Sequence, residues 1–532
     1  MRPPLLPTLG CLLATSLAAQ RTEKSPDDPA RAFFAGLPVV RVQLSFDETS
    51  RQLLREKPRE YAPATLVLDD TTFAKVGVKL KGAAGSFRDF DDTPGFTIHL
   101  GKFGGEERFH GLQRFHLNNG AQDESRLCEW LGHEVFTAAK YPAPRVGHAI
   151  VRVDERSPRL YVLREAYDKQ FLRRVFGDDL HGNLYDGGFC QDVDAELEKD
   201  SGDGPDDRAD LQALCELCRG VDQRRAEALG KAVDVAAFLD FVALEAMVGH
   251  WDGYCQNANN FRLWLPKQGP AVFLPHGMDQ IFGDSEASVL DHPPSIVASA
   301  VLQQPSFRKR YRERLKALLP LFAPDRLRKQ LEPAAAAIQR ALKPIDAEAA
   351  RAHADAVRDL LERVEARHKS LVEQVKAPEP KPLALARGKP LLLKTWHPGA
   401  ETSGINLERK TTPQGPAHQL EVKQKGEEPR RGSYHTHVLL GPGRYELRGT
   451  VRCTGVQPPP KDEEGHEHGG VTLRAGDGAS ERLTGDVAWR PLVCEFTVEQ
   501  FQQNVELRCD FHGFVGKAWF RLDSLVLVRV GD

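Results

Sequence analysis

Three prolines within five residues interrupt the chain at A-P-E-P-K-P, residues 377–382. Proline has no amide hydrogen and fixes φ, so neither a helix nor a central strand can continue through this segment. The sequence also changes in character here, from Ala- and Leu-rich helical patterns to short β-like runs separated by Gly and Pro. We therefore predict two folded parts, at residues 36–376 and 383–532, joined by a linker at 377–382.

The composition is typical of a globular protein. Of the 532 residues, 41% are hydrophobic and 28% are charged, which is enough apolar sequence for two or three domains. The formal net charge is −3 and the sequence has no long run of Lys and Arg. Nucleic acid is therefore not an expected partner.

Residues 1–20 have the features of a signal peptide, namely Arg2, an apolar run from Leu9 to Leu17, and the small residues Ala18 and Ala19. This predicts export to the periplasm, the cell surface or the extracellular space. A membrane-spanning helix needs about 20 apolar residues, and no later stretch reaches that length. We expect no transmembrane segment.

Residues 383–532 read as an all-β jelly-roll sandwich, because short β-like runs alternate with Gly and Pro turns. The runs G-P-G-R-Y-E-L-R-G and W-F-R-L-D-S-L-V-L-V resemble carbohydrate-binding modules in their layout. A cell-surface glycan is therefore a candidate partner. Trp396, Trp489 and Trp519 could present their rings to a sugar or could fill the core of the sandwich.

The first part begins with strands at 40–46, 65–68, 75–81, 96–100 and 114–117. A helix at 124–140, strands at 148–153 and 160–164, and a helix at 168–176 follow, which is the element order of a protein-kinase small lobe. In that lobe a strand Lys holds the α- and β-phosphates and a helix Glu steadies it. Lys81 and Glu129 are the candidates here, although such residues are often simply solvated. Glu165, directly after a strand, is expected near the adenine side.

A second constellation lies between His250 and Gly283, which reads H-W-D-G-Y-C-Q-N-A-N-N-F-R-L-W and, after a turn, V-F-L-P-H-G-M-D-Q-I-F-G. The spacing H-x-D-x-x-x-x-N matches a kinase catalytic loop, and D-Q-I-F-G is a loose counterpart of D-F-G. Asp252 would orient or deprotonate an acceptor hydroxyl, and Asn257 and Asp279 would hold Mg²⁺. Alternatively, Asp252 and Asn257 only cap a turn.

These residues resemble the CotH kinase family, the atypical secreted or surface-associated protein kinases named for a spore coat protein. The resemblance runs from Val39 to about Val375 and is carried by G-V-K-L-K-G, F-H-G-L-Q-R-F-H-L-N-N, P-A-P-R, Y-V-L-R-E, N-L-Y and the 250–283 stretch. It implies an α+β fold with an atypical two-lobed kinase-like domain. It also implies ATP and Mg²⁺ or Mn²⁺ as cofactors, and transfer of the γ-phosphoryl group to Ser or Thr of a secreted or surface protein.

One position departs from the family pattern. Family members often carry a Lys just before the P-G-F strand, where this chain has Thr93. Either Lys81 or Lys79 substitutes for that Lys, or nucleotide binding is impaired. Two alternatives therefore stay open: a non-catalytic envelope or polysaccharide-binding protein on a degenerate kinase fold, and a metal-dependent hydrolase that uses Asp252 and Asp279. Likewise, G-A-A-G-S at 82–86 could approach a phosphate or form an ordinary hairpin turn.

Overall fold

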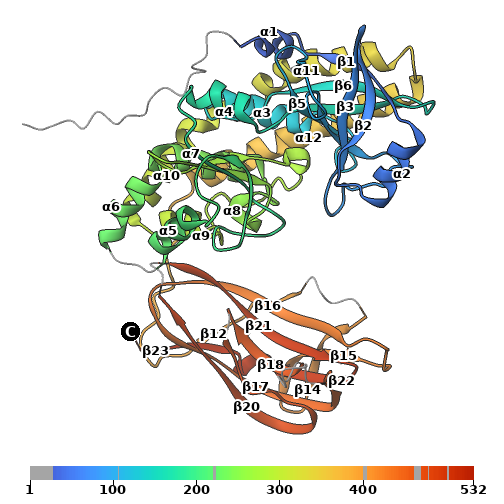
Figure 1. Cartoon of the computed structure of the whole chain (residues 1–532). Helices are drawn as coiled ribbons and strands as arrows, with labels where there is room; N and C mark the ends of the chain where they lie inside the picture. The colour runs from blue at the N-terminus through green and yellow to red at the C-terminus, as the bar shows by residue number, and fades with distance from the viewer. Residues whose placement is uncertain are drawn as a thin grey trace, which may run out of the picture. The chain divides into compact units, whose positions relative to one another are not determined.

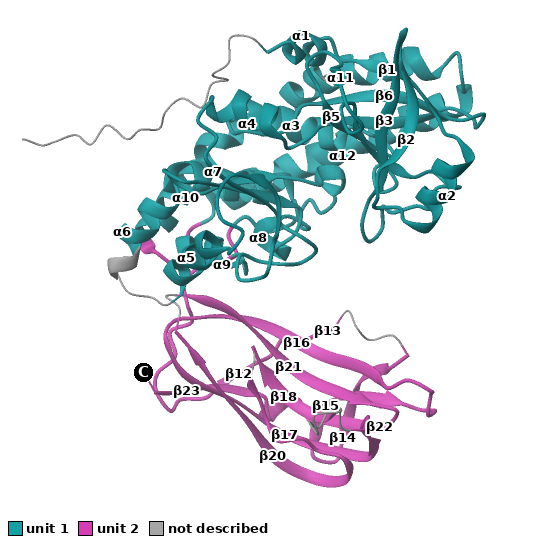
Figure 2. Cartoon of the chain, viewed as in Figure 1, with its two compact units in different colours: residues 1–289, 293–302, 306–377 teal, residues 290–292, 303–305, 378–532 magenta. Residues whose placement is uncertain are grey.

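The computed structural model describes residues 28–105, 107–219, 223–399, 404–460, 469–476, 478–499 and 502–531. The predicted signal peptide at 1–20 lies outside these residues. The chain has a mixed α/β architecture (Figure 1) and divides into two compact units (Figure 2). The first comprises residues 1–289, 293–302 and 306–377, and the second comprises residues 290–292, 303–305 and 378–532. No described helix is long and apolar enough to cross a membrane.

Seven strands of the first unit form a closed barrel in the order β1-β2-β3-β4-β5-β7-β6. They are β1 (Val39–Ser45), β2 (Ala62–Leu68), β3 (Thr71–Lys81), β4 (Gly95–His99), β5 (Arg114–Asn118), β6 (Val146–Val153) and β7 (Arg159–Glu165). Strand direction cannot alternate all the way round a ring with an odd number of strands. The closing pair, β1 with β6, is accordingly parallel, whereas the other pairs of the ring are antiparallel.

The observed order β5, α3 (Cys128–Ala138), β6, β7, α4 (Lys169–Phe176) agrees with the predicted sequence of strand, helix, strand, strand, helix. Closure into a barrel was not predicted, because the pairing of β1 with β6 joins segments about 100 residues apart in sequence. The arrangement of this unit in two kinase-like lobes stays a prediction.

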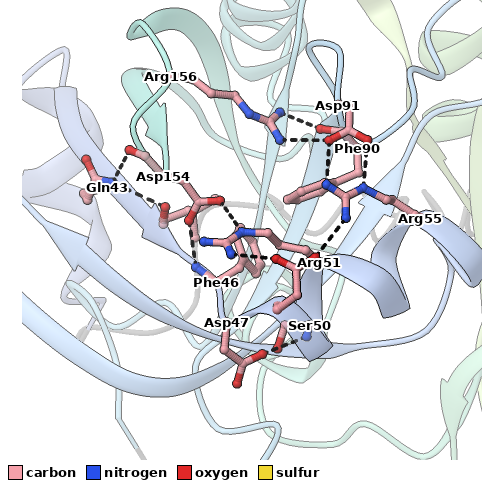
Figure 3. A network of polar contacts seen from close by, with 12 residues as sticks. Gln43, Phe46, Asp47, Ser50, Arg51, Arg55, Phe90, Asp91, Asp154 and Arg156 are labelled. Carbon is pink, nitrogen blue, oxygen red and sulfur yellow. Dashed lines mark hydrogen bonds and ion pairs between the residues drawn. The ribbon is translucent and has the colours of Figure 1, made fainter.

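A polar network fastens α2 (Glu48–Glu56) to the barrel (Figure 3). Asp47 caps the helix by accepting a hydrogen bond from the Ser50 amide at 2.7 Å. Asp154, in the turn after β6, accepts hydrogen bonds from the Phe46 amide at 2.9 Å and from Arg51 Nε at 3.0 Å. Asp154 therefore fixes both the backbone just before the helix and a side chain of the helix itself.

Helix α3 is shorter than the predicted helix at 124–140 because its beginning is taken up by a turn. The Asp123 carboxylate accepts hydrogen bonds from the Ser125 amide at 3.0 Å and from the Cys128 amide at 2.8 Å. Asp and Asn commonly favour such local bonds over a helix interior. The helix therefore begins at Cys128, and Glu129 lies in its first turn.

A four-stranded sheet in the order β11-β10-β8-β9 follows in the first unit. Its strands are β8 (Gly182–Asp186), β9 (Glu198–Gly202), β10 (Phe261–Pro266) and β11 (Val272–Pro275). The acidic segment at 192–210 contains β9, which pairs with β8. The polar composition of β9 concealed a strand that is stabilised by its backbone pairing.

Helix α7 (Val235–Val248) is capped by Asp234, which accepts hydrogen bonds from the amides of Ala236 and Ala237. It is buried on most of its sides. The other helices of the first unit, including two 3₁₀ helices, are α1 (Ala30–Ala35), α5 (Ala209–Cys218), α6 (Gln223–Ala232), α8 (Tyr254–Asn257), η1 (Met278–Gln280), α9 (Ile296–Leu302), α10 (Pro305–Leu318), η2 (Leu319–Phe322), α11 (Pro324–Leu342) and α12 (Ala347–Lys376).

Arg367 of α12 fixes both ends of the 250–283 stretch. Its side chain is fully buried and donates to the carbonyls of Ala246 at 2.6 Å and Met247 at 3.0 Å, at the end of α7. It also donates to the carbonyls of Ser285 at 2.9 Å and Ala287 at 2.6 Å. A single guanidinium therefore bridges the chain just before the stretch and just after it.

The second unit is an antiparallel β-sandwich with one apolar core. One sheet contains β12 (Leu391–Leu392), β14 (Asn406–Thr412), β15 (Gly415–Val422), β17 (Gly443–Gln457), β20 (Gly485–Val498), β22 (Val515–Arg521) and β23 (Val526–Gly531). The other contains β13 (His397–Pro398), β16 (Arg430–Leu440), β18 (Gly470–Ala475), β19 (Gly478–Ala479) and β21 (Gln503–Gly513). A 3₁₀ helix, η3 (Leu522–Ser524), lies between β22 and β23. Trp396 belongs to the core, whereas Trp489 and Trp519 are partly exposed.

Candidate functional site

A cavity of about 410 Å³ in the first unit brings together residues that are far apart in sequence. Barrel strands β3, β4, β5 and β7, helix α3 and the 250–283 stretch all contribute to its walls. Four of the predicted site residues line it: Lys81, Glu129, Asp252 and Asp279. Asn257 and Glu165 are not among its lining residues.

The 250–283 stretch is held rigidly where it enters the site. Helix α7 is followed by Gly249, which adopts the left-handed conformation with φ +69°. The buried His250 imidazole bonds through Nε2 to the His276 carbonyl at 2.9 Å. Glu245 accepts hydrogen bonds from the amides of Tyr254 at 3.2 Å and Cys255 at 2.9 Å. Burial raises the pKa of Glu245 to about 7.

Three asparagine amides surround the Asp252 carboxylate. Oδ1 accepts from Asn257 Nδ2 at 2.7 Å and from Asn259 Nδ2 at 3.0 Å. Oδ2 accepts from Asn260 Nδ2 at 2.8 Å. A carboxylate only accepts hydrogen bonds, so each amide turns its nitrogen toward Asp252 and its oxygen away. The carboxylate is thereby fixed in orientation, and the amide oxygens point elsewhere.

Among these asparagines, Asn259 and Asn260 line the cavity. Asn260 Oδ1 lies against Gly277, where a Cβ atom would come within 2.3 Å of this oxygen. Gly277 also has φ +59°, so glycine is required there for two reasons. The spacing rule selected Asn257, but the backbone turn after α8 brings the two later asparagines to the cavity.

Asp279 lies in the short helix η1 and faces the same cavity. Burial, together with the nearby carboxylates of Glu129 and Asp123, raises the pKa of Asp279 to about 7. A carboxylate destabilised in this way is a good partner for a divalent cation. Among the described residues, no group of three or more His, Cys, Asp and Glu side chains forms a metal cage. Mg²⁺, however, typically uses one or two carboxylates together with water and phosphate oxygens, which fits Asp279 with an asparagine oxygen.

Lys81 and Glu129 are connected through a third residue. Lys81 Nζ donates to Asn118 Oδ1, and Asn118 Nδ2 donates to Glu129 Oε2 at 2.5 Å. The cation that is ion-paired with Glu129 is instead Arg164, with Nε 3.6 Å from Oε1. Burial and the neighbouring Arg164 lower the pKa of Lys81 to about 8.

The loop after β3 also lines the cavity, through Gly82, Ala83, Ala84 and Ser86. The loop connects β3 to β4, and these two strands pair antiparallel with Lys81 opposite Gly95, as in a β-hairpin. Its backbone is therefore both a turn and part of the cavity wall. The Ala83 amide is already bonded to Ser86 Oγ at 3.2 Å, which leaves fewer amides available to a ligand.

Two other predicted positions lie elsewhere. Glu165 is 3% exposed and binds Arg145 Nη2 and Arg174 Nη2, each at 2.7 Å. Burial alone would raise the pKa of Glu165, but Arg174 and Arg145 hold it lowered to about 2. Thr93 lines a different cavity and accepts a hydrogen bond from Asn119 Nδ2 through its carbonyl at 2.8 Å.

Sequence reasoning did not select Asn118, Arg164, Asn260 or His276. Two of these carried a signal, since Asn260 belongs to the segment N-A-N-N and Asn118 to the pair N-N at the end of β5. Arg164 lies in Y-V-L-R-E and His276 in the 250–283 stretch, but neither residue was assigned a role there. They reach the cavity only because β7 and the end of β11 are placed beside it by barrel and sheet pairing.

The model of the family described as CotH kinase protein matches residues 78–371, which is more than half of the sequence. The chain belongs to the CotH kinase protein family. The match includes all six predicted site residues. No curated protein matches the chain.

Several solved structures show low similarity. One contains the CBM22-1 and GH10 modules of Clostridium thermocellum endo-1,4-β-D-xylanase 10B with xylohexaose, at 10% identity and a TM-score of 0.18, covering 25% of this chain and 26% of that one. This CotH family member thus spans about a quarter of the length of the xylanase chain. Another is a family 61 carbohydrate-binding module with β-1,4-galactotriose, at 14% identity and a TM-score of 0.18, covering 25% and 88% of the two chains. A family 11 module of a Clostridium thermocellum cellulase has 11% identity and a TM-score of 0.16, covering 27% and 96%. Scores this low assign neither a fold nor a ligand.

Proposed function

We propose that this protein is an exported atypical protein kinase that transfers the γ-phosphoryl group of ATP to Ser or Thr of a secreted or surface protein. The carrying observation is that Lys81, Glu129, Asp252 and Asp279 line one cavity. These are the residue types that phosphoryl transfer requires: a cation for phosphate, a carboxylate for metal and a carboxylate for the acceptor hydroxyl. Membership of the CotH kinase family supports the same reaction class.

Each residue has a distinct part in this proposal. Asp252, held by three amides, accepts or orients the proton of the acceptor hydroxyl. Asp279 holds the Mg²⁺ or Mn²⁺ ion, together with an asparagine oxygen from Asn257 or Asn260. The metal would neutralise charge on the transferred phosphoryl group. Lys81 contacts the phosphates, and Asn118 couples its position to Glu129. Glu165, which is ion-paired away from the cavity, stabilises the end of β7.

The Asp252→Asn variant tests this proposal. An amide in place of the carboxylate cannot accept the acceptor's proton, so transfer should fall by about 100-fold or more while ATP binding persists. The measurement is incorporation of label from γ-labelled ATP into the protein itself and into casein as a generic acceptor. Asp70→Asn, at a fully exposed carboxylate, is the matched control. Equal incorporation by Asp252→Asn and the control would contradict the assigned role.

One observation favours a second candidate, a non-catalytic binding protein on the same fold. Glu129 is ion-paired with Arg164 and not with Lys81, which differs from the arrangement of an active kinase. Calorimetric titration with ATP, with and without Mg²⁺ or Mn²⁺, separates the two candidates. Metal-dependent binding followed by label transfer supports the kinase, whereas binding without transfer to any acceptor supports the second candidate.

For the β-sandwich we propose a glycan at the cell surface as its ligand. Trp489 and Trp519 are partly exposed, and each donates its indole N–H to a glutamine, Gln414 at 3.1 Å and Gln419 at 2.9 Å. An exposed aromatic ring beside hydrogen-bonding side chains suits the apolar face and hydroxyl rim of a sugar. Retention of wild type, but not Trp519→Ala, on insoluble polysaccharides is the expected result. Equal retention would exclude this ring as the platform.

A further inference from the structure

Arg164 is a buried cation whose hydrogen-bonding capacity is incompletely used. The residue is 1% exposed, lies near the end of β7 and lines the cavity. Its Nη2 bonds to His276 Nε2 at 3.0 Å, and its Nε faces Glu129 at 3.6 Å. Within the described part of the chain, Nη1 has no hydrogen-bond partner. A buried guanidinium with an unmet donor is costly unless a ligand supplies the acceptor.

His276 provides a second unmet donor in the same cavity. A guanidinium can only donate, so His276 Nε2 must accept from Arg164. An Nε2 that accepts carries no proton, so the imidazole is neutral and its proton lies on Nδ1. That nitrogen is buried and unbonded among the described residues. Arg164 Nη1 and His276 Nδ1 are therefore two donor nitrogens that lack acceptors among the described residues.

Strand register explains why Arg164 faces the cavity. Arg164 is opposite His116 on β5, His116 is opposite Thr97 on β4, and Thr97 is opposite Lys79 on β3. Directly opposed residues share one face of a sheet, and all four line the cavity. Thr97 Oγ1 and His116 Nδ1 are 3.1 Å apart, so these two side chains satisfy one another. Lys79 and Arg164 form the charged ends of this polar row.

We propose that Arg164 and His276 form an anion-binding subsite that holds a phosphate group of the nucleotide. This inference rests on the proposed kinase function. The guanidinium suits a phosphate because its planar N–H groups match two phosphate oxygens. Arg164 and Lys81 approach Glu129 from different sides, one directly and one through Asn118, so both cations lie beside the same carboxylate.

Glu129 is the positioning residue of this subsite, because it holds Arg164 without contacting the ligand itself. The Tyr167 ring supports Arg164 from a second side, with its centroid 5.6 Å from the guanidinium carbon. The subsite also supplies the cation that Thr93 does not, since Thr93 lies in another cavity. A chain with Thr in place of the usual Lys can thereby still bind phosphate.

The test is calorimetric titration with three probes: inorganic tripolyphosphate, adenosine, and ATP with Mg²⁺. Arg164→Met is expected to weaken tripolyphosphate binding by about 10- to 100-fold, which corresponds to one lost charged hydrogen-bonding group, and to leave adenosine binding unchanged. Arg164→Lys keeps the buried charge, and with it the pairing to Glu129, so it should fold and show an intermediate loss. Arg152→Met, at an exposed arginine of the neighbouring strand β6, is the matched control and should bind like wild type.

Three results would overturn the subsite. The first is equal tripolyphosphate affinity of wild type and Arg164→Met. The second is equal weakening of adenosine and tripolyphosphate binding, which would indicate a purely structural role. The third is no tripolyphosphate binding by wild type. The kinase proposal fails separately, through the ATP titration and the label-transfer assay. Metal-dependent ATP binding that is insensitive to Arg164 would leave the kinase proposal standing without this subsite.

Discussion

At the scale of single residues, the site is organised around two carboxylates with opposite surroundings. Asp252 receives amide hydrogen bonds on both oxygens, whereas Asp279 faces the like charges of Glu129 and Asp123 in a buried setting. The first arrangement fixes an orientation, and the second creates a demand for a cation. These surroundings fit the two proposed roles, with Asp252 acting on the acceptor hydroxyl and Asp279 binding the metal.

Metal-dependent nucleotide binding should rise with pH through the pKa of Asp279. Burial raises that pKa to about 7, so the protonated carboxyl competes with metal below this pH and the ionised carboxylate binds metal above it. For one displaced proton, the affinity for Mn²⁺-ATP should be roughly 10-fold lower at pH 6 than at pH 8. The Asp279→Asn variant is the control, because any pH dependence that remains in it comes from other groups such as ATP and Lys81. The same pH profile in wild type and variant would remove Asp279 from the metal site.

A paired comparison separates the two candidate amide ligands. Asn260 lines the cavity and Asn257 does not, although both hold Asp252. Asn260→Ala should therefore weaken Mg²⁺-dependent ATP binding, by about 10-fold for the loss of one ligand. Asn257→Ala should lower phosphoryl transfer through Asp252 and leave that binding nearly unchanged. The reverse order of effects in the calorimetric titration would restore Asn257 as the ligand.

At the scale of elements, local signals in the sequence predicted helices well and predicted barrel closure not at all. Both ends of α7 depend on local signals, since Asp234 caps its beginning and Gly249 directly follows its last residue, and each acts within one turn. Asp252 and Asp279 could be named because motif spacing is also local. Lys81 and Glu129 could be named because the order of strands and helices matches that of a kinase small lobe. Arg164 and His276 could not, because their positions depend on which strands pair.

Arg367 is the element-scale contact on which we expect the site to depend. Arg367→Met leaves the carbonyls of Ala246, Met247, Ser285 and Ala287 without this donor, so the free energy of unfolding should fall by about 3 kcal/mol or more. Affinity for Mg²⁺-ATP should also fall, since both ends of the 250–283 stretch are released. Denaturant unfolding and calorimetry give the two readouts.

The control for this change is Arg358→Met on the same helix α12. Arg358 is exposed and pairs only with nearby Asp355 in the contacts described, so its loss should change stability by no more than about 0.5 kcal/mol. An Arg367 variant as stable as this control would show that the four carbonyl contacts are not needed.

At the scale of the whole molecule, the units change over between Ala377 and Pro378, and the apolar core of the β-sandwich is built from residues after 383. We predict that a fragment of residues 36–376 unfolds cooperatively and binds nucleotide, and that residues 383–532 fold separately as a targeting domain. Circular dichroism during thermal unfolding and ATP titration of each fragment test this division. Non-cooperative melting of the second fragment, or ATP binding that requires both, would contradict it.

The parallel pairing of β1 with β6 also means that the barrel cannot close until β6 has been synthesised. Val39 pairs with His148, so one edge of β1 stays open until about 110 further residues have left the ribosome. An open strand edge is a template for pairing with other chains. A nascent chain that stops before β6 therefore leaves the edge of β1 unpaired, whereas a chain extended past β7 can close the barrel and pair this edge. Strand β1, near the start of the chain, thus depends on the later strand β6 to prevent its free edge from pairing with other chains.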